Sequence, residues 1–180
     1  MKDNSLQKDP VSEMFEVIDE EGSVIGLAPR RECHGNPSLI HRVVHVLVAN
    51  GEGDLLLQRR SHQKDIQPGK WDTSVGGHLH PGEDYERAGR REMAEELGIL
   101  NGPLMVLYDY RWRSPIESEQ VRTYLCQWDG PFHPDEEEIL EARFWSPEEI
   151  CHHLGDGTFT PNFEEEFARY LQWKGRMHHA

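Results

Sequence analysis

The chain has 180 residues and a formal net charge of −14 at pH 7, because 33 acidic side chains outnumber 19 lysines and arginines. A negative charge of this size opposes binding to nucleic acid through its phosphates and binding to anionic membranes. No apolar stretch approaches the roughly 18 residues of a membrane span, and the polar start, MKDNSLQKDP, lacks the apolar segment of a signal peptide.

Cys33, Cys126 and Cys151 are scattered, odd in number and form no CxxC pair. A disulfide framework or a zinc ribbon is therefore not expected, and a reducing cytoplasm fits the composition best. A chain of this length is expected to fold as a single domain over residues 1–180, with residues 1–12 as a flexible lead-in.

Short strand patterns bounded by turn residues alternate with a few helical patterns along the chain. Strands are predicted over Glu16–Ile18, Val24–Ala28, His41–Ala49, Asp54–Gln58, Trp71–Val75, Leu104–Trp112, Gln120–Trp128 and Glu141–Trp145. Helical segments are predicted over Arg30–His34, over Asp84–Leu97, from Ser146-Pro147, and from Thr160-Pro161 to about Lys174, the last with an apolar face of Phe163, Phe167, Tyr170 and Leu171. Mixed strands and helices indicate the α/β class.

The segment Asp84–Leu97 combines helix formers with Gly98, a residue suited to ending a helix. In a helix, Glu92, Glu95 and Glu96 stand at i, i+3 and i+4, so their carboxylates gather on one patch. Like charges at this spacing cost roughly 0.2–0.5 kcal/mol per pair in an isolated helix. A solvated acidic face would explain the three glutamates alone, whereas a divalent cation such as Mg²⁺ would give the patch a use.

The glutamates belong to a longer pattern that starts at Gly77 and ends at Ile99. It reads Gly77, five residues, Glu83, seven residues, then Arg91-Glu92-Met93-Ala94-Glu95-Glu96-Leu97-Gly98-Ile99. This resembles the Nudix box, G-x5-E-x7-R-E-U-x-E-E-x-G-U with U aliphatic, at all nine constrained positions over 23 residues. The resemblance implies an α/β/α sandwich with a mixed sheet.

The same resemblance implies a Mg²⁺- or Mn²⁺-dependent hydrolase that cleaves a phosphoanhydride bond in a diphosphate linked to a group X. Glu95 and Glu96 would be metal ligands, Glu92 a ligand or the general base, and the carbonyl of Gly76 a further ligand. Arg91 would pair with Glu83, and Gly77 and Gly98 would have structural roles in the motif. The substrate is a small molecule, with nucleoside diphosphates, sugar nucleotides, dinucleotides and prenyl diphosphates all open.

Outside this motif, residues from about 14 to 165 are similar to type I isopentenyl-diphosphate isomerases and their hydrolase-like relatives. That resemblance implies a second metal site, for Zn²⁺ or Mn²⁺, made of His34, His41, His78, Glu117 and Glu119, with His45 and His80 as substitutes if the register differs. Each residue also has an ordinary explanation as a strand, core or turn residue.

The similarity to the isomerases also covers cations and aromatic residues. Arg60 and Lys64, with Arg30, would hold the distal phosphate of the substrate, although paired surface cations are often only solvated. Trp71 or Trp112 could stack on the group X. Tyr110 resembles a tyrosine near the isomerase reaction centre, but a half-buried strand tyrosine is the more ordinary interpretation.

Two departures favour a hydrolase over an isomerase. Gly76 stands where the isomerases need a cysteine, and Glu92 and Glu95 are kept where the isomerases lose these positions. The alternatives are an isomerase-like enzyme without the cysteine and a non-catalytic module that binds a diphosphate and regulates a partner. The sequence predicts no oligomeric state.

Overall fold

The computed structural model describes residues 13–64 and 66–177, so the predicted flexible lead-in at residues 1–12 lies outside the described residues. The elements follow in the order β1 (Met14–Ile18), β2 (Val24–Pro29), α1 (Arg30–Cys33), β3 (Ile40–Ala49), β4 (Leu55–Arg60), β5 (Trp71–Asp72), β6 (Val75–His78), α2 (Tyr85–Leu97), β7 (Met105–Arg113), β8 (Ser118–Gln127), β9 (Ile139–Trp145), α3 (Pro147–His153) and α4 (Pro161–Met177). Among these helices, none is both long and apolar enough to cross a membrane.

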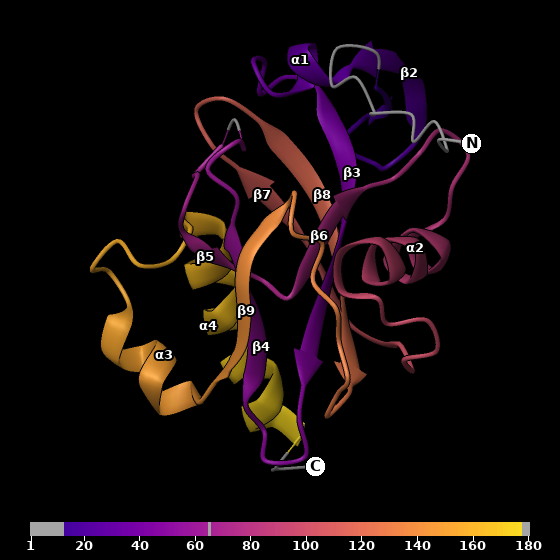
Figure 1. Cartoon of the computed structure of the whole chain (residues 1–180). Coiled ribbons are helices and arrows are strands. Elements are labelled where there is room, and N and C mark those ends of the chain that lie inside the picture. The colour runs from indigo at the N-terminus through magenta and orange to yellow at the C-terminus, as the bar shows by residue number, and fades with distance from the viewer. Residues whose placement is uncertain (1–12, 65, 178–180) are drawn as a thin grey trace, which may run out of the picture.

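The long strand β3 is the centre of a mixed sheet (Figure 1). It runs parallel to β8 over ten residue pairs and antiparallel to β1, β4 and β6. Strand β7 extends the sheet beyond β8, and β9 and β5 flank β4. The predicted hairpin of β3 and β4 is present, but only Val48 and Ala49 pair with β4 before the two strands separate.

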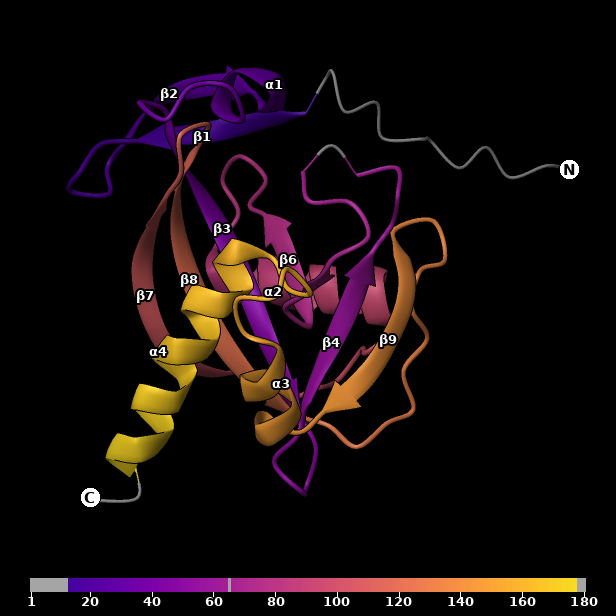
Figure 2. The same ribbon diagram turned by 90° about the vertical axis from the view of Figure 1, so that its left-hand side faces the viewer.

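Beyond this short ladder the sheet forks, with β3 and its partners on one arm and β4, β5 and β9 on the other (Figure 2). Ser74 lies between the arms. Its hydroxyl accepts from the Val48 amide at 2.8 Å and donates to the Leu56 carbonyl on β4. The side chain therefore holds the two diverging backbones together at the fork.

Helices cover both faces of the sheet, as expected for an α/β/α sandwich, and that expectation is confirmed. Along β3, Val44, Val46 and Val48 face the core under α2, whereas Leu47 and Ala49 face the core under α3 and α4. Figure 2 shows α4 on the near face and α2 on the far face. The near-continuous apolar run of β3 follows from burial on both sides.

Helix α2 begins and ends as its sequence predicts. Asp84 caps the first turn by accepting from the Arg87 amide at 2.9 Å, and Gly98 ends the helix in the left-handed region at φ 66°. Ser146 caps α3 in the same way through the Glu149 amide. These local signals set the ends of α2, and the packing of its Met93 and Leu97 into the core places the helix against the sheet.

Two expectations about the elements are wrong. The strand predicted over Trp71–Val75 is split into β5, which pairs with β4, and β6, which pairs with β3. The split occurs because Ser74 uses its side chain, and not a regular ladder, to bridge the arms. On α4, Leu171 is 39% exposed and lies outside the apolar face, and Trp173 packs against the core instead.

Candidate active site

A cavity of about 460 Å³ occupies the fork between β3 and β4. Because the sheet is open there, side chains from both of its faces reach the same space. Glu96 of α2 lines the cavity from one face, and His45 of β3 lines it from the other. The adjacent glycines Gly76 and Gly77 of β6 lie between them.

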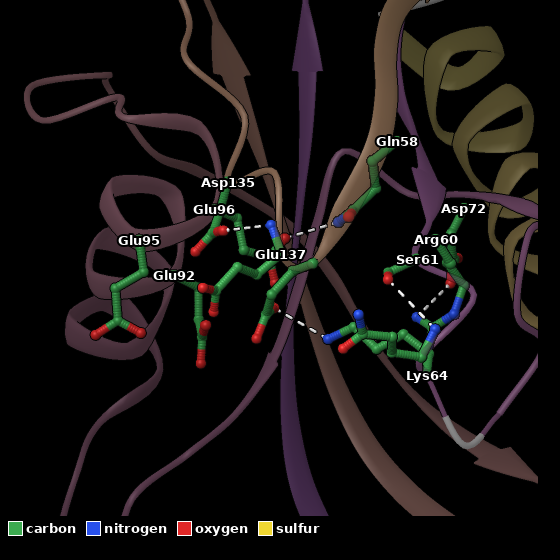
Figure 3. Close-up of polar contacts among 12 residues, drawn as sticks. Gln58, Arg60, Ser61, Lys64, Asp72, Glu92, Glu95, Glu96, Asp135 and Glu137 are labelled. Carbon is green, nitrogen blue, oxygen red and sulfur yellow. Dashed lines mark hydrogen bonds and ion pairs between the residues drawn. The ribbon is translucent and has the colours of Figure 1, made fainter. Parts of the chain in front are cut away.

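Glu92, Glu95 and Glu96 project from α2 at one side of the site, opposite Arg60 and Lys64 (Figure 3). Glu96 is buried, and its Oε2 accepts from Gln58 Nε2 of β4 at 2.7 Å. Burial, followed by the charges of Glu92 and Glu138, raises the pKa of Glu96 well above its usual range. Ionisation of Glu96 is unfavourable because the side chain is buried beside other carboxylates. A bound cation would lower the free energy cost of that ionisation.

Arg91 fixes the orientation of the acidic patch. Its guanidinium makes a bidentate contact with Glu83, with Nε–Oε1 at 3.1 Å and Nη2–Oε2 at 2.9 Å. Its Nη1 contacts Glu92 Oε1 at 2.6 Å, and its Nη2 donates to the His78 carbonyl at 3.0 Å. Arg91 therefore links α2 to the loop before it and to the end of β6.

Gly77 lets β6 pack directly against α2. A β-carbon built on Gly77 would lie 2.1 Å from Glu92 Cδ, which is far inside van der Waals contact. Only glycine leaves room for Glu92 at this point. On the opposite side of β6, Gly76 faces His45 in the register with β3.

The three histidines predicted as ligands lie together. One ring nitrogen from each of His34, His41 and His78 falls within 4.8 Å of the others, and the Nε2 atoms of His34 and His78 are 3.2 Å apart. Glu117 lies 3.9 Å from His34 and Glu119 lies 3.8 Å from His41. Pairing between strands distant in the sequence produces this convergence, because β3 places His41 beside Glu119 of β8 and Val43 beside His78 of β6.

The chemistry of these residues fits a metal ion. His41 Nε2 is buried without a hydrogen-bond partner among the described residues. Burial, followed by the nearby His34, lowers the pKa of His41 to about 4, and burial lowers the pKa of His78 well below its ordinary value. Both imidazoles are therefore neutral near pH 7, which is the form that binds a metal. Phe15 stacks on His78 with ring centroids 4.2 Å apart and holds the ring in place.

The two substitute histidines lie elsewhere. His80 is half-exposed and its Nδ1 is 4.0 Å from Glu83, outside the histidine cluster. His45 pairs with Glu166 of α4. Of the aromatic residues, Trp112 lines the cavity, whereas Trp71 packs edge-on against Trp145.

The predicted phosphate-binding cations line the cavity and contact carboxylates. Arg60 contacts Asp72 at 3.1 Å, and Lys64 contacts Glu138 at 3.0 Å. Arg30, near the histidine cluster, contacts Glu13 at 3.2 Å. A phosphate that enters the cavity would take the place of these carboxylates as the anionic partner of the cations.

The sequence patterns did not predict a role for Gln58, Thr123 or Glu166, and the resemblance named His45 only as a substitute metal ligand. Gln58 positions Glu96, and it lies on a strand where its polar side chain has no local signature. His45, Glu166 and Thr123 form a buried hydrogen-bonded group drawn from β3, α4 and β8. No local sequence motif connects these three residues, because their contacts depend on the packing of α4 against the sheet.

Comparisons with known proteins agree with the arrangement of the fold. The NUDIX domain model matches residues 39–167. An uncharacterized Nudix hydrolase of Yersinia pestis is 34% identical over 161 residues, covering 89% of this chain and 87% of the relative. An isopentenyl-diphosphate Delta-isomerase of Nocardia farcinica is 33% identical over 173 residues, covering 89% of this chain and 98% of the relative. The crystal structure of DR0079 from Deinococcus radiodurans matches with a TM-score of 0.77 at 27% identity, covering 87% of this chain and 98% of that one.

Proposed function

Because the chain belongs to the Nudix hydrolase family, we propose that it cleaves a phosphoanhydride bond in a small molecule that carries a diphosphate on a group X. The observation that carries the proposal is the composition of the cavity in the fork. Buried Glu96 lines one wall, and Arg60 and Lys64 line the opposite one. Carboxylates for a cation and cations for phosphate thus meet in one space, as phosphoanhydride hydrolysis requires.

Family members typically use divalent metals, and we propose that Glu92, Glu95 and Glu96 hold Mg²⁺ or Mn²⁺, with the Gly76 carbonyl as a further ligand. A bound cation of this kind lowers the pKa of water and neutralises charge on phosphate oxygens. Glu92 lies against Gly77, and Arg91 donates to its carboxylate, so its side chain is held in place for the proposed role of ligand or general base. Buried Glu96, held by Gln58, is preorganised to contact a cation.

Arg60 and Lys64 would bind the distal phosphate by exchanging their present carboxylate partners for it. Asp72 and Glu138 contact these cations and orient them at the cavity. Arg91, by contrast, makes five hydrogen bonds within the protein, to Glu83, Glu92, Glu95 and the His78 carbonyl, and acts as a positioning residue.

His34, His41, His78, Glu117 and Glu119 would form a second metal site, for Zn²⁺ or Mn²⁺, on the other face of the sheet. Imidazole ligands favour these metals over Mg²⁺. His34, His78, Glu117 and Glu119 line the same cavity as Glu96. One substrate could therefore contact both sites.

The experiment that tests the proposal is a phosphate-release screen with Mg²⁺ and with Mn²⁺. Nucleoside diphosphates, sugar nucleotides, dinucleotides and prenyl diphosphates form the panel. Metal-dependent release from at least one class, lost in Glu96→Gln, supports the hydrolase. No release from any class in either metal contradicts it.

A second candidate is an isomerase-like reaction, which the clustered histidines and the Nocardia farcinica relative favour. The glycine at position 76 argues against this candidate, because the isomerases need a cysteine there. Among the described residues, no cysteine lines the cavity. Incubation with isopentenyl diphosphate separates the candidates, since an isomer formed without phosphate release would favour the isomerase. Tight diphosphate binding without any turnover would instead favour a regulatory binding module.

We also place the reaction in the cytoplasm, because Cys33, Cys126 and Cys151 are all free thiols. Cys33 and Cys126 are buried, so neither is placed to form a disulfide bond in an oxidising compartment.

A further inference from the structure

His45 is a buried histidine at the cavity that neither proposed metal site uses. It lies on β3, is only 5% exposed, and lines the cavity. The register of β3 with β6 places it beside Gly76. A β-carbon built on Gly76 would lie 3.4 Å from His45 Cδ2 and 3.5 Å from its Nε2. The absence of a side chain at Gly76 therefore leaves the Nε2 edge of the ring open to the cavity.

The other edge of the His45 ring is fixed by Glu166. The Nδ1 atom lies 3.0 and 3.1 Å from the two carboxylate oxygens, and Glu166 is fully buried on α4. Thr123 of β8 donates to the same carboxylate at 2.7 Å, so the carboxylate cannot rotate freely. A carboxylate only accepts, and Nδ1 must therefore carry its proton toward Glu166.

A buried carboxylate needs a compensating charge. Among the ion pairs of the described residues, Glu166 has His45 as its partner, so the buried carboxylate is balanced when both ring nitrogens of His45 carry a proton. With both nitrogens protonated, Nε2 is a charged donor aimed at the cavity. The structure gives Nε2 no hydrogen-bond partner among the described residues.

His45 lies between the two groups of candidate metal ligands, the acidic patch of α2 and the histidine cluster. Along β6, Gly77 faces Glu92 on one side of the sheet, and Gly76 faces His45 on the other. His78 follows on the same strand and belongs to the histidine cluster. A diphosphate that reaches from the acidic patch to the histidine cluster must pass Gly76.

We infer that His45 is a further substrate-binding residue, which donates from Nε2 to an oxygen of the diphosphate, and that Glu166 is the residue that positions it. This inference rests on the proposed binding of a diphosphate in the cavity. It assigns Gly76 a second use, because any larger side chain there would stand between the ring and the phosphate. It also explains why α4, which carries no part of the acidic motif, contributes a fully buried glutamate behind the site.

The test uses inorganic pyrophosphate with Mg²⁺ as the probe, measured by calorimetry on the full chain, together with KM and kcat for any substrate from the screen. We expect His45→Gln to weaken pyrophosphate binding and to raise KM by about tenfold, with a smaller change in kcat. Glu166→Gln, which removes the charge but keeps the size, should shift KM in the same direction. His80→Gln, a half-exposed histidine outside the cavity, is the matched control and should change neither value.

A measurement on the unaltered protein covers the case in which the His45 variant does not fold. In ¹⁵N-histidine NMR with Mg²⁺, pyrophosphate should shift the Nε2 resonance of His45 and leave its Nδ1 and the His80 ring unchanged. No pyrophosphate binding by the wild type, or binding that neither moves this resonance nor depends on His45, overturns the inference. His45-dependent binding without hydrolysis of any substrate would retain the inference and reject the proposed hydrolase.

Discussion

Gly77 and Glu92 approach so closely that a β-carbon on Gly77 would lie 2.1 Å from the Glu92 carboxylate carbon. The contact joins β6 to α2, the helix that carries the acidic patch. It makes the glycine a requirement of the site geometry, because any side chain there would push Glu92 away from Arg91.

Gly77→Ala should lower kcat by about tenfold to a hundredfold, because small displacements of catalytic groups carry costs of that size. Overpacking should also destabilise the fold by about 1–3 kcal/mol. Gly26→Ala is the matched control, since nothing lies within 4 Å of its added β-carbon and it is also on a strand. Steady-state kinetics and thermal melts measure both effects. Equal activity of the two alanine variants would show that the contact has no role in catalysis.

Glu96→Gln and Glu92→Gln should each lower kcat by about 10² or more, because each removes a candidate ligand or base. The metal-free Glu96→Gln protein should be as stable as the wild type or more stable. Its amide can still accept from Gln58, and the buried acid is gone. Glu86→Gln on the same helix, exposed and paired with Arg90, is the control. Near-normal turnover in both site variants would place the active site elsewhere.

Gln58→Met should lower kcat by about tenfold while keeping the volume of the side chain. The change removes the Nε2 donor that orients Glu96 and leaves a buried carboxyl oxygen unsatisfied, at a cost of about 1–3 kcal/mol. Gln127→Met, an exposed position at the end of β8, is the control for the same replacement on a strand. Chemical denaturation and kinetics provide the readout, and unchanged kcat in Gln58→Met would show that Glu96 is oriented without it.

Zn²⁺ binding at the histidine cluster should strengthen as the pH rises from about 6 to 8, by roughly tenfold per unit, and then level off. Burial and the adjacent Glu117 raise the pKa of Glu119 to about 8, so this ligand must lose a proton when the metal binds. The pKa of His41 is about 4, so His41 contributes no proton in this range. Calorimetry in buffers of different ionisation enthalpy should detect the release of about one proton at about pH 7. His41→Gln should abolish this binding and His80→Gln should keep it.

The raised pKa of Glu119 also predicts how the stability of the protein without metal depends on pH. Glu119 releases its proton near 4.5 when unfolded and near 8 when folded, so its contribution to stability is present below 4.5 and is lost as the pH rises to about 8. Added Zn²⁺ should offset that loss. Glu119→Gln should remove this loss, whereas the lowered pKa values of His41 and His78 act in the opposite direction in both proteins. An unchanged pH dependence of the melting temperature in Glu119→Gln would contradict the assignment of Glu119.

The sequence predicted the features that depend on neighbours along the chain. Asp84 and Gly98 bound α2 through local caps, and the spacing of Glu92, Glu95 and Glu96 fixes their common face without reference to any other element. The near-continuous apolar run of β3 likewise needed no partner to be recognised as a strand. Resemblance added the ordered histidines and glutamates, which local patterns could not connect.

Tertiary structure alone decided which of these residues meet. His41 lies beside Glu119 because β3 and β8 are parallel in one particular register, and Gln58 reaches Glu96 because β4 leaves β3 at the fork. Ser74 split a predicted strand, and Glu166 reached His45 from a position 121 residues away. Strand pairing and helix docking are set by burial summed over the whole core, and a short segment of sequence carries little information about that sum.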